Sequence, residues 1–250
     1  MDKLDLENML VDHYIGNLPA VSKPVSYIMQ GDGLWEIRKN SIGIFRKRVA
    51  KIHIPGLTSN MWQGVELTVP KIPIDLFWKS IAFFRKVYDI YGTESAVRVI
   101  YDKKAKRYFL DCPTQEVSSV SCSFDREKNF PNGIVVAELH SHGSFAAAFS
   151  PTDDKDEVAD RFYGIVGKVS EFFPQVCFRA SVGGKWLTIK VEDLFDLESD
   201  PMVQAKFPSK WMDSVKLQEQ ITDLDLFEKD FEGLEEIKGL RVTWPKKSKP

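Results

Sequence analysis

The sequence predicts a mixed α/β fold in which helices flank a mixed β-sheet, with an additional β-rich region at the N-terminus. Helix-like and strand-like hydrophobic patterns alternate in the middle of the chain, which is typical of a sheet with helices packed on its faces. Short alternating apolar runs separated by glycine turns precede them, and such runs are hairpin signals. The chain has 250 residues and is 43% hydrophobic, so it can bury one large core or two modest ones.

Residues 1–70 are expected to form a β-rich N-terminal module. Pro70 and Pro73 mark its boundary, because proline interrupts helices and sheets alike. Gly31-Asp32-Gly33 separates the first two strand-like runs as a hairpin turn would. The runs occupy residues 25–30, 34–38, 42–45 and 65–69.

Residues 71–200 are expected to form the main domain. Apolar residues at helical spacing predict an amphipathic helix over 74–91, and a second helix is expected to begin after Ser150 and to run from 151 to about 170. The expected strands cover residues 95–101, 107–112, 134–142, 176–182 and 185–191.

Residues 201–250 are expected to form a C-terminal extension. Residues 217–237 are rich in Leu, Asp and Glu, which indicates one or two short helices. The chain ends in Lys-Lys-Ser-Lys-Pro, which predicts a frayed basic tail.

The composition bears on compartment and partners. Lys and Arg number 34 against 36 Asp and Glu, and the net charge of −2 gives no global electrostatic case for binding nucleic acid. Cys112, Cys122 and Cys177 are unevenly spaced without a C-x-x-C pair, so neither a disulfide framework nor a cysteine zinc site is expected. The N-terminus lacks the features of a signal peptide, and no apolar run approaches the ~20 residues that cross a bilayer. We therefore expect a cytoplasmic protein without membrane or nucleic-acid partners.

Two of the four histidines, His140 and His142, follow the apolar run 133–137. If this run is a strand, the alternation of side chains places both imidazoles on one face, where they can bind one metal ion. A catalytic zinc ion takes three protein ligands and keeps the fourth position for water. Asp153 is the natural third ligand, because Ser150 and Pro151 are typical of a helix start and place it in the first turn.

Hydrolysis by a metal-bound water also requires a general base, and a carboxylate near the metal commonly serves. The candidates are Glu94, Glu138, Glu116 and Glu66. Glu138 lies on the same face of the expected strand as the histidines. The hydroxyl of Ser150 can point at a developing oxyanion, a role in which one donor typically contributes ~3 kcal/mol.

Each half of this pattern also has a purely structural explanation. Paired histidines on a strand are not rare, and S-x-x-D before a helix is ordinarily a capping box. A cap predicts nothing about histidines further upstream, whereas a metal site predicts both halves together.

The joint pattern resembles the signature of the JAMM, or MPN-plus, metalloprotease family, a glutamate followed by H-[ST]-H-x7-S-x-x-D. Here it stands as His140-Ser141-His142, seven residues, and Ser150-Pro151-Thr152-Asp153, without a difference in spacing. The resemblance implies an MPN/JAB fold of the cytidine-deaminase-like class, with zinc held by His140, His142 and Asp153. It further implies that Ser150 stabilises the tetrahedral intermediate and that an upstream glutamate is the base.

In the family this glutamate sits where the first helix gives way to the first central strand, and Glu94 matches by location. The pattern E-x-x-G-x-L-x-G, which often follows the glutamate in eukaryotic members, is absent here, so Glu138 and Glu66 remain alternatives. Gly143 stands where many members have proline, a difference that affects the stiffness of the loop more than the chemistry.

The resemblance covers roughly residues 74–200 and is closest to bacterial JAB-domain proteins encoded beside ubiquitin-like, E1-like and E2-like genes, including protein A of PRTRC systems. It implies a deubiquitinase-like zinc peptidase or isopeptidase that cleaves the amide bond at the C-terminus of a ubiquitin-like protein. A ubiquitin-like protein or its conjugates, and E1-like or E2-like proteins, are the implied partners. Two alternatives stay open: a non-catalytic MPN-type scaffold for such partners, and a metal hydrolase acting on another amide or, as in RadC-like domains, on nucleic acid.

Overall fold

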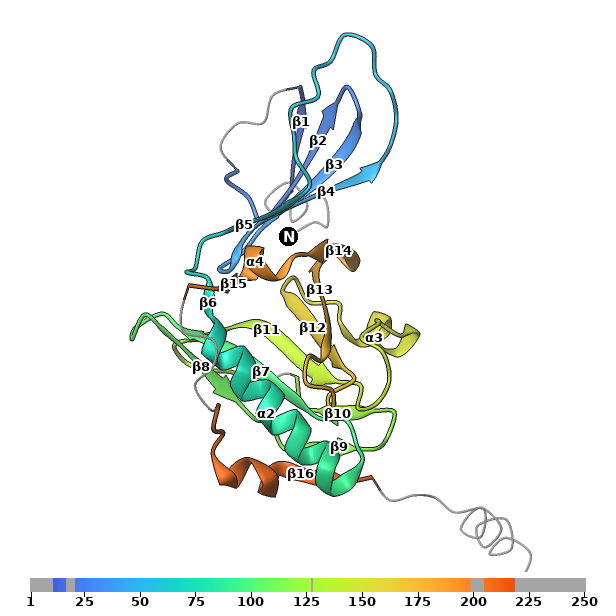
Figure 1. Cartoon of the computed structure of the whole chain (residues 1–250). Helices are drawn as coiled ribbons and strands as arrows, with labels where there is room; N and C mark the ends of the chain where they lie inside the picture. Colours follow the sequence, from blue (N-terminus) through green and yellow to red (C-terminus); the bar gives the residue numbers. More distant parts are fainter. Residues whose placement is uncertain (1–10, 17–20, 127, 199–204, 219–250) are drawn as a thin grey trace, which may run out of the picture. The chain divides into compact units, whose positions relative to one another are not determined.

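The computed structural model describes residues 11–16, 21–126, 128–198 and 205–218. The chain divides into two compact units, residues 1–217 and 218–250, and all described helices and strands belong to the first. The fold is mixed α/β, and strands make up most of its regular structure (Figure 1). The predicted helices of 217–237 and the basic tail lie almost wholly outside the described residues.

A five-stranded sheet occupies the N-terminal region, in the order β1-β2-β3-β4-β5. Its strands are β1 (Val11–Ile15), β2 (Val25–Gln30), β3 (Gly33–Lys39), β4 (Gly43–Ala50) and β5 (Gly64–Leu67). β1 pairs in parallel with β2, and the later pairs are antiparallel. The four predicted strands correspond to β2, β3, β4 and β5, and most of their ends agree within a few residues. β1 was not predicted.

A six-stranded mixed sheet in the order β14-β13-β12-β11-β7-β8 follows in the chain. Its strands are β7 (Ala96–Asp102), β8 (Arg107–Asp111), β11 (Gly133–Ser141), β12 (Phe162–Gly167), β13 (Gln175–Val182) and β14 (Lys185–Ile189). β11 pairs in parallel with β12 and antiparallel with β7, so it lies in the interior of the sheet.

Helix α2 (Ile74–Tyr91) crosses one face of this sheet, as its sequence periodicity predicts (Figure 1). Phe77, Ile81 and Phe84 recur at helical spacing and are buried, which sets the face that packs on the strands. Gly92 ends the helix in the left-handed conformation, with φ 67°, and its N–H donates to Tyr88 O at 2.8 Å. The chain then turns into β7.

The prediction of a helix from 151 to about 170 is wrong. The helix α3 begins at Pro151 as expected but ends at Asp156, and β12 occupies part of the remaining segment. β12 is buried throughout, and a side chain at Gly164 would collide with the ring of Phe178. The fold is mixed α/β as predicted but has fewer helices than expected, since α2 is the one helix longer than six residues in the described part of the chain.

Shorter elements complete the unit. They are β6 (Ile72–Pro73), β9 (Gln115–Val117), β10 (Cys122–Phe124), α4 (Val191–Leu194), β15 (Phe195–Asp196), the 3-10 helix η1 (Ser209–Ser214) and β16 (Val215–Leu217). β10, β9 and β16 form a separate small sheet in that order. Trp211 of η1 packs edge-on against Phe83 of α2, which ties this segment to the core.

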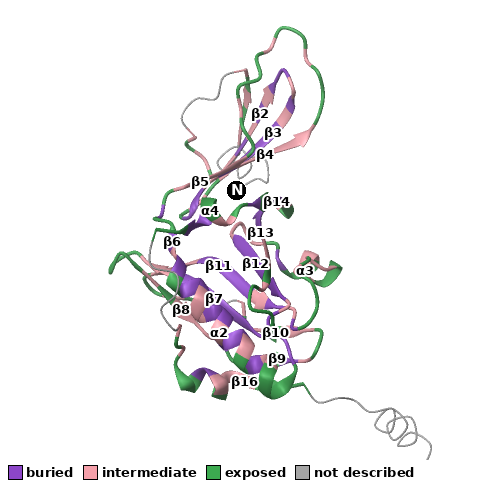
Figure 2. Cartoon of the chain, in the orientation of Figure 1, coloured by how far each residue is buried: buried purple, intermediate pink, exposed green. Residues whose placement is uncertain are grey.

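The main apolar core spans both large sheets, and Ile28, Trp35 and Ile37 form a second, smaller cluster within the N-terminal sheet. Phe45 of β4 and Phe162 of β12 have ring centroids 5.8 Å apart and belong to the same buried cluster. Buried residues concentrate on β7, β11 and β12 and on one side of α2 (Figure 2). Within the described residues, no helix has the length and apolar character needed to cross a membrane.

Candidate metal centre

The C-terminal end of β11 carries both histidines. His140 pairs with Ala96 of β7 on one side and Ile165 of β12 on the other, and His142 N donates to Val166 O at 2.9 Å just beyond the strand. This pairing fixes the backbone on both sides of the two imidazoles. His140 Nε2 lies 3.0 Å from His142 Nε2, so the rings share one face, as the alternation of side chains predicts.

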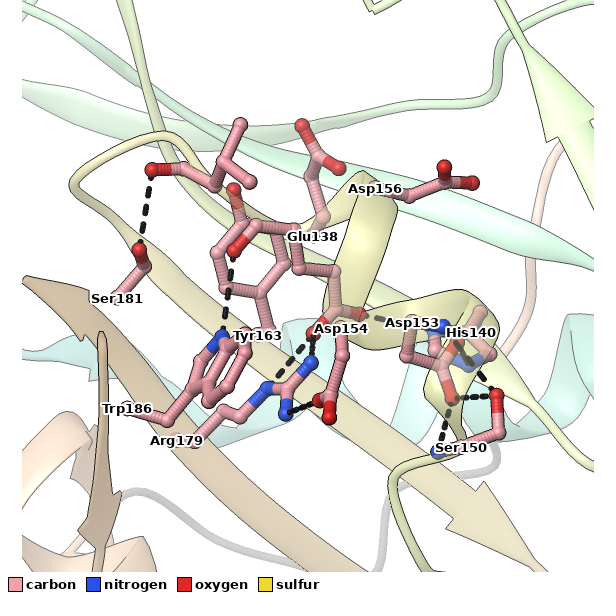
Figure 3. Close-up of polar contacts among 12 residues, drawn as sticks. Glu138, His140, Ser150, Asp153, Asp154, Asp156, Tyr163, Arg179, Ser181 and Trp186 are labelled. Carbon is pink, nitrogen blue, oxygen red and sulfur yellow. Dashed lines mark hydrogen bonds and ion pairs between the residues drawn. The ribbon is translucent and has the colours of Figure 1, made fainter. Parts of the chain in front are cut away.

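The N-terminus of α3 brings Asp153 to the same point. Ser150 is the N-cap and Pro151 follows it, as the sequence predicts, and the capping box with Asp153 is complete. Asp153 Oδ1 lies 3.2 Å from His140 Nε2, and Asp153 Oδ2 lies 3.7 Å from His142 Nε2. Figure 3 shows the carboxylate between Ser150 and the ring of His140.

The seven-residue loop between the two halves of the site is held by backbone hydrogen bonds. Phe145 N donates to His142 O at 2.8 Å, and its carbonyl accepts from Lys168 N at 2.8 Å. Val169 N donates to Gly143 O at 3.0 Å. Gly143 adopts φ 53°, which allows the sharp turn immediately after the second histidine.

The three side chains form a donor set that can hold a metal ion. One ligand atom from each of His140, His142 and Asp153 lies within 4.8 Å of the others. Around a tetrahedral zinc ion with bonds of ~2.0–2.1 Å, ligand atoms lie about 3.3 Å apart. The two imidazole nitrogens are 3.0 Å apart, and the distances of 3.2 and 3.7 Å run to the two different oxygens of Asp153. These separations lie on either side of that value, so two imidazole nitrogens and the carboxylate of Asp153 fit the group.

The charges around the site keep Asp153 ionised. Burial by itself would raise its pKa, but the hydrogen bond and charge of His140 and the hydrogen bonds from Ser150 hold that pKa well below its usual range. For His140, burial by itself would lower the pKa, yet Asp153, Glu157 and Glu94 raise it overall. Burial and the neighbouring His140 lower the pKa of His142, which favours a neutral imidazole at neutral pH. An ionised Asp153 and a neutral His142 are the forms that bind metals, whereas a protonated His140 has to release a proton before it can bind one.

Glu94 lies in the connection between α2 and β7 and lines the same cavity as His140 and Asp153. Its side chain is 6% exposed, and this burial, with a smaller contribution from Asp153 and against that of His140, raises the pKa of Glu94 to about 7. Glu94 N donates to Ser118 O at 2.9 Å. A carboxylate with such a pKa can accept a proton and release it near neutrality.

The other base candidates are placed less favourably. Glu138 lines the cavity, but its Oε1 accepts from Arg161 Nη1 at 2.6 Å and its Oε2 lies 3.4 Å from Arg126 Nε. Both carboxylate oxygens of Glu138 are therefore engaged by guanidinium groups. Glu66 belongs to β5 and forms an exposed ion pair with Arg46, and Glu116 is exposed and lines a different cavity. The geometry favours Glu94.

The hydroxyl of Ser150 is engaged in the helix cap. It donates to Asp153 Oδ2 at 2.7 Å and accepts from Asp153 N at 3.2 Å. The structural explanation of S-x-x-D therefore holds here, alongside a place for Ser150 in the cavity wall. To donate to a reacting oxygen, this hydroxyl has to rotate away from Asp153.

The cavity around these groups has a volume of about 390 Å³. Residues 120–124, which include strand β10, also line it. No model of a known protein family matches this chain, and no curated protein sequence matches it. The assignment of a function therefore rests on the sequence pattern and on the geometry of this site.

Sequence reasoning missed Glu157 and Arg179. Glu157, the C-cap of α3, is 3% exposed, and its Oε1 lies 3.7 Å from His140 Nδ1. Arg179 of β13 donates to Glu157 Oε2 at 2.9 and 2.7 Å. The one sequence signal for Glu157 is its position four residues after Asp153, which places both carboxylates on one side of a helical turn. Nothing in the sequence connects Arg179 to the site.

Proposed function

We propose that this protein is a zinc-dependent peptidase or isopeptidase of the JAMM type that cleaves the amide bond at the C-terminus of a ubiquitin-like protein. The observation that carries the proposal is the convergence of His140, His142 and Asp153 beside a buried glutamate, Glu94, in one cavity. The sequence pattern that resembles the JAMM signature predicted His140, His142 and Asp153, and it favoured Glu94 by location over Glu138 and Glu66.

The same resemblance leads us to propose that residues 71–200 form an MPN/JAB-type domain. Three features support this assignment. Helix α2 leads into β7 with Glu94 at the junction, β11 lies in the interior of the mixed sheet, and α3 begins over the end of β11. In the JAMM family, too, the glutamate lies between the first helix and the first central strand.

His140, His142 and Asp153 would hold the zinc ion. Bound zinc supplies a Lewis acid for the scissile carbonyl and lowers the pKa of a bound water to about 7. Glu94 accepts the proton of the attacking water and passes it to the departing amine, because a pKa of about 7 allows this carboxylate both to take up and to release a proton near neutrality. Ser150, once its hydroxyl turns from Asp153, donates a hydrogen bond to the oxyanion.

The outer edge of β10, which pairs with no other strand in the described part of the chain, is the proposed docking site for the substrate tail. β10 is an outer strand of its sheet, pairs with β9 on its other side, and contributes Cys122, Ser123 and Phe124 to the cavity wall. An extended peptide that adds to this edge is held in register by main-chain hydrogen bonds, and its end enters the cavity beside Glu94. A flexible C-terminal tail fits this arrangement better than a folded loop.

The test is a cleavage assay with the zinc-loaded protein. Candidate ubiquitin-like proteins that carry a short C-terminal extension are incubated with it, and the products are weighed by mass spectrometry. Cleavage after the terminal glycine is expected, and it should stop in the presence of a chelator and with Asp153→Asn. Zinc binding without cleavage of any such fusion would instead favour a scaffold or a different amide substrate.

A further inference from the structure

A buried carboxylate, Glu157, lies behind His140 on the side away from the other two candidate ligands. His140 Nε2 faces Asp153 Oδ1 at 3.2 Å, while His140 Nδ1 faces Glu157 Oε1 at 3.7 Å. The second oxygen of Glu157, Oε2, accepts two N–H groups from Arg179, at 2.9 and 2.7 Å. The two carboxylate oxygens therefore serve different partners, and Oε1 is the one that faces the imidazole.

Arg179 holds this carboxylate rigidly. Its guanidinium is 3.8 Å from the ring centroid of Phe149 and 4.7 Å from that of Trp186. Its Nη1 donates to Asp154 Oδ1 at 2.5 Å, and Figure 3 shows this pair beside the helix that carries Asp153. Arg179 is 5% exposed, so contacts with protein groups replace most of its contact with water.

We propose that Glu157, held by Arg179, is the positioning residue for His140. An imidazole that binds a metal through Nε2 carries its proton on Nδ1, and a carboxylate behind Nδ1 fixes both the tautomer and the plane of the ring. This inference rests on the proposed function, because it concerns the metal-bound state of His140. His142 has a different partner, since its ring interacts with the backbone of Ala146.

Only a carboxylate at position 157 can face both Arg179 and His140 Nδ1 with oxygen atoms. Glutamine offers one oxygen acceptor, so its amide group would have to face either Arg179 or His140 Nδ1 with N–H bonds. Glu157→Gln therefore leaves one of the two contacts repulsive while it nearly preserves the volume of the side chain. Glu36→Gln is the matched control. Glu36 is 1% exposed, accepts from Arg38 Nε at 2.6 Å, and belongs to β3 of the N-terminal sheet.

The first experiment measures zinc affinity by competition with a chromophoric chelator at a temperature where all variants are folded. Glu157→Gln is expected to weaken zinc binding about 10–100-fold, the usual effect of losing an outer partner of a metal-bound histidine. Glu36→Gln is expected to lower the melting temperature and leave zinc affinity unchanged. Equal zinc affinities for Glu157→Gln and the wild type would overturn the proposal.

A second measurement uses the wild-type protein. It tests the proposal even if the Glu157→Gln variant does not fold. Nitrogen NMR of the zinc-loaded wild type is expected to show His140 with zinc on Nε2 and a slowly exchanging proton on Nδ1. Zinc on Nδ1 would refute the positioning role while leaving the proposed function intact. A wild-type protein that takes up no zinc would refute both.

Discussion

The side-chain amide of Gln115 pairs with the backbone of Ala96 as a neighbouring strand would. Its Oε1 accepts from Ala96 N at 2.7 Å, and its Nε2 donates to Ala96 O at 3.0 Å. On the same short segment, Ser95 N donates to the hydroxyl of Ser141 at 3.0 Å, and Ser95 O accepts from Ser141 N at 2.9 Å. The residues that follow Glu94 are thus tied to the first residue of β9 and to β11, the strand that carries His140.

The first prediction follows from the hydrogen bonds between Gln115 and Ala96. Gln115→Leu is expected to lower kcat about 10–100-fold with zinc content unchanged, because displacement of a catalytic group by about 1 Å has effects of that order. Steady-state kinetics and metal analysis on the same sample measure it. Gln63→Leu is the control, since Gln63 is an exposed residue whose side chain accepts from Arg48 N. Full activity in Gln115→Leu would show that the hydrogen bonds of Gln115 do not position Glu94.

The second prediction concerns the identity of the base. Glu94→Gln is expected to retain zinc and to lose turnover by about 10²–10⁴-fold, the usual contribution of a positioned acid–base group. Glu138→Gln, the matched buried glutamate of the same cavity, is expected to retain far more activity because Arg161 already neutralises the carboxylate. The reverse ranking of the two variants would transfer the role to Glu138.

The third prediction uses the stability of the metal-free protein. The pKa of Glu94 is raised from 4.5 to about 7, so the folded state holds this proton more tightly than the unfolded chain does. Its contribution to stability is fully present below pH 4.5 and is lost as the pH rises through about 7. The free energy of unfolding of Glu94→Gln relative to wild type should therefore rise by ~2 kcal/mol between about pH 5 and about pH 8.

Urea unfolding in the presence of a chelator measures this difference. The sign of the change in this difference is informative. A rise with pH shows that ionised Glu94 destabilises the folded protein. A difference that stays constant across the pH range would mean that Glu94 titrates alike in the folded and unfolded chains.

The fourth prediction concerns the turn after His142. A Cβ atom at Gly143 would lie 2.8 Å from the ring of Tyr88, and its φ of 53° is unfavourable for other residues by ~1–2 kcal/mol. Gly143→Ala should lower the free energy of unfolding by more than Gly184→Ala does, because Gly184 has φ 71° with open space around it. Gly143→Pro should be worse, since proline requires a negative φ. Equal losses for the two alanine variants would mean that Tyr88 moves aside freely.

The sequence predicted those helices and strands that have a clear hydrophobic periodicity or clear boundary residues. Helix α2 shows a clear apolar stripe and a glycine C-cap, and it has the predicted bounds. β12 was missed because Phe162–Gly167 is buried on both faces, and a continuous apolar run does not distinguish a strand from a buried helix. The capping box at Ser150 strengthened the wrong choice, since a cap marks where a helix begins and carries no information about its length.

The candidate site could be predicted only where its residues fall into one short pattern. His140, His142 and Asp153 are separated by fixed spacings on adjoining elements, so the sequence could place them together. Gln115 and Arg179 reach the site through the order of strands in two sheets, which no local pattern encodes. Glu94 could be proposed from the resemblance, and its burial emerges from the packing around the end of α2.

The metal content of the purified protein tests the central claim most directly. Wild type and the variants His140→Ala, His142→Ala and His53→Ala are equilibrated with zinc, separated from free metal, and analysed by mass spectrometry for zinc per chain. Wild type and His53→Ala, which alters an exposed histidine outside the site, are predicted to hold close to one equivalent, and the other two are predicted to hold almost none. A wild-type protein without zinc, or equal zinc in all four proteins, would contradict the account.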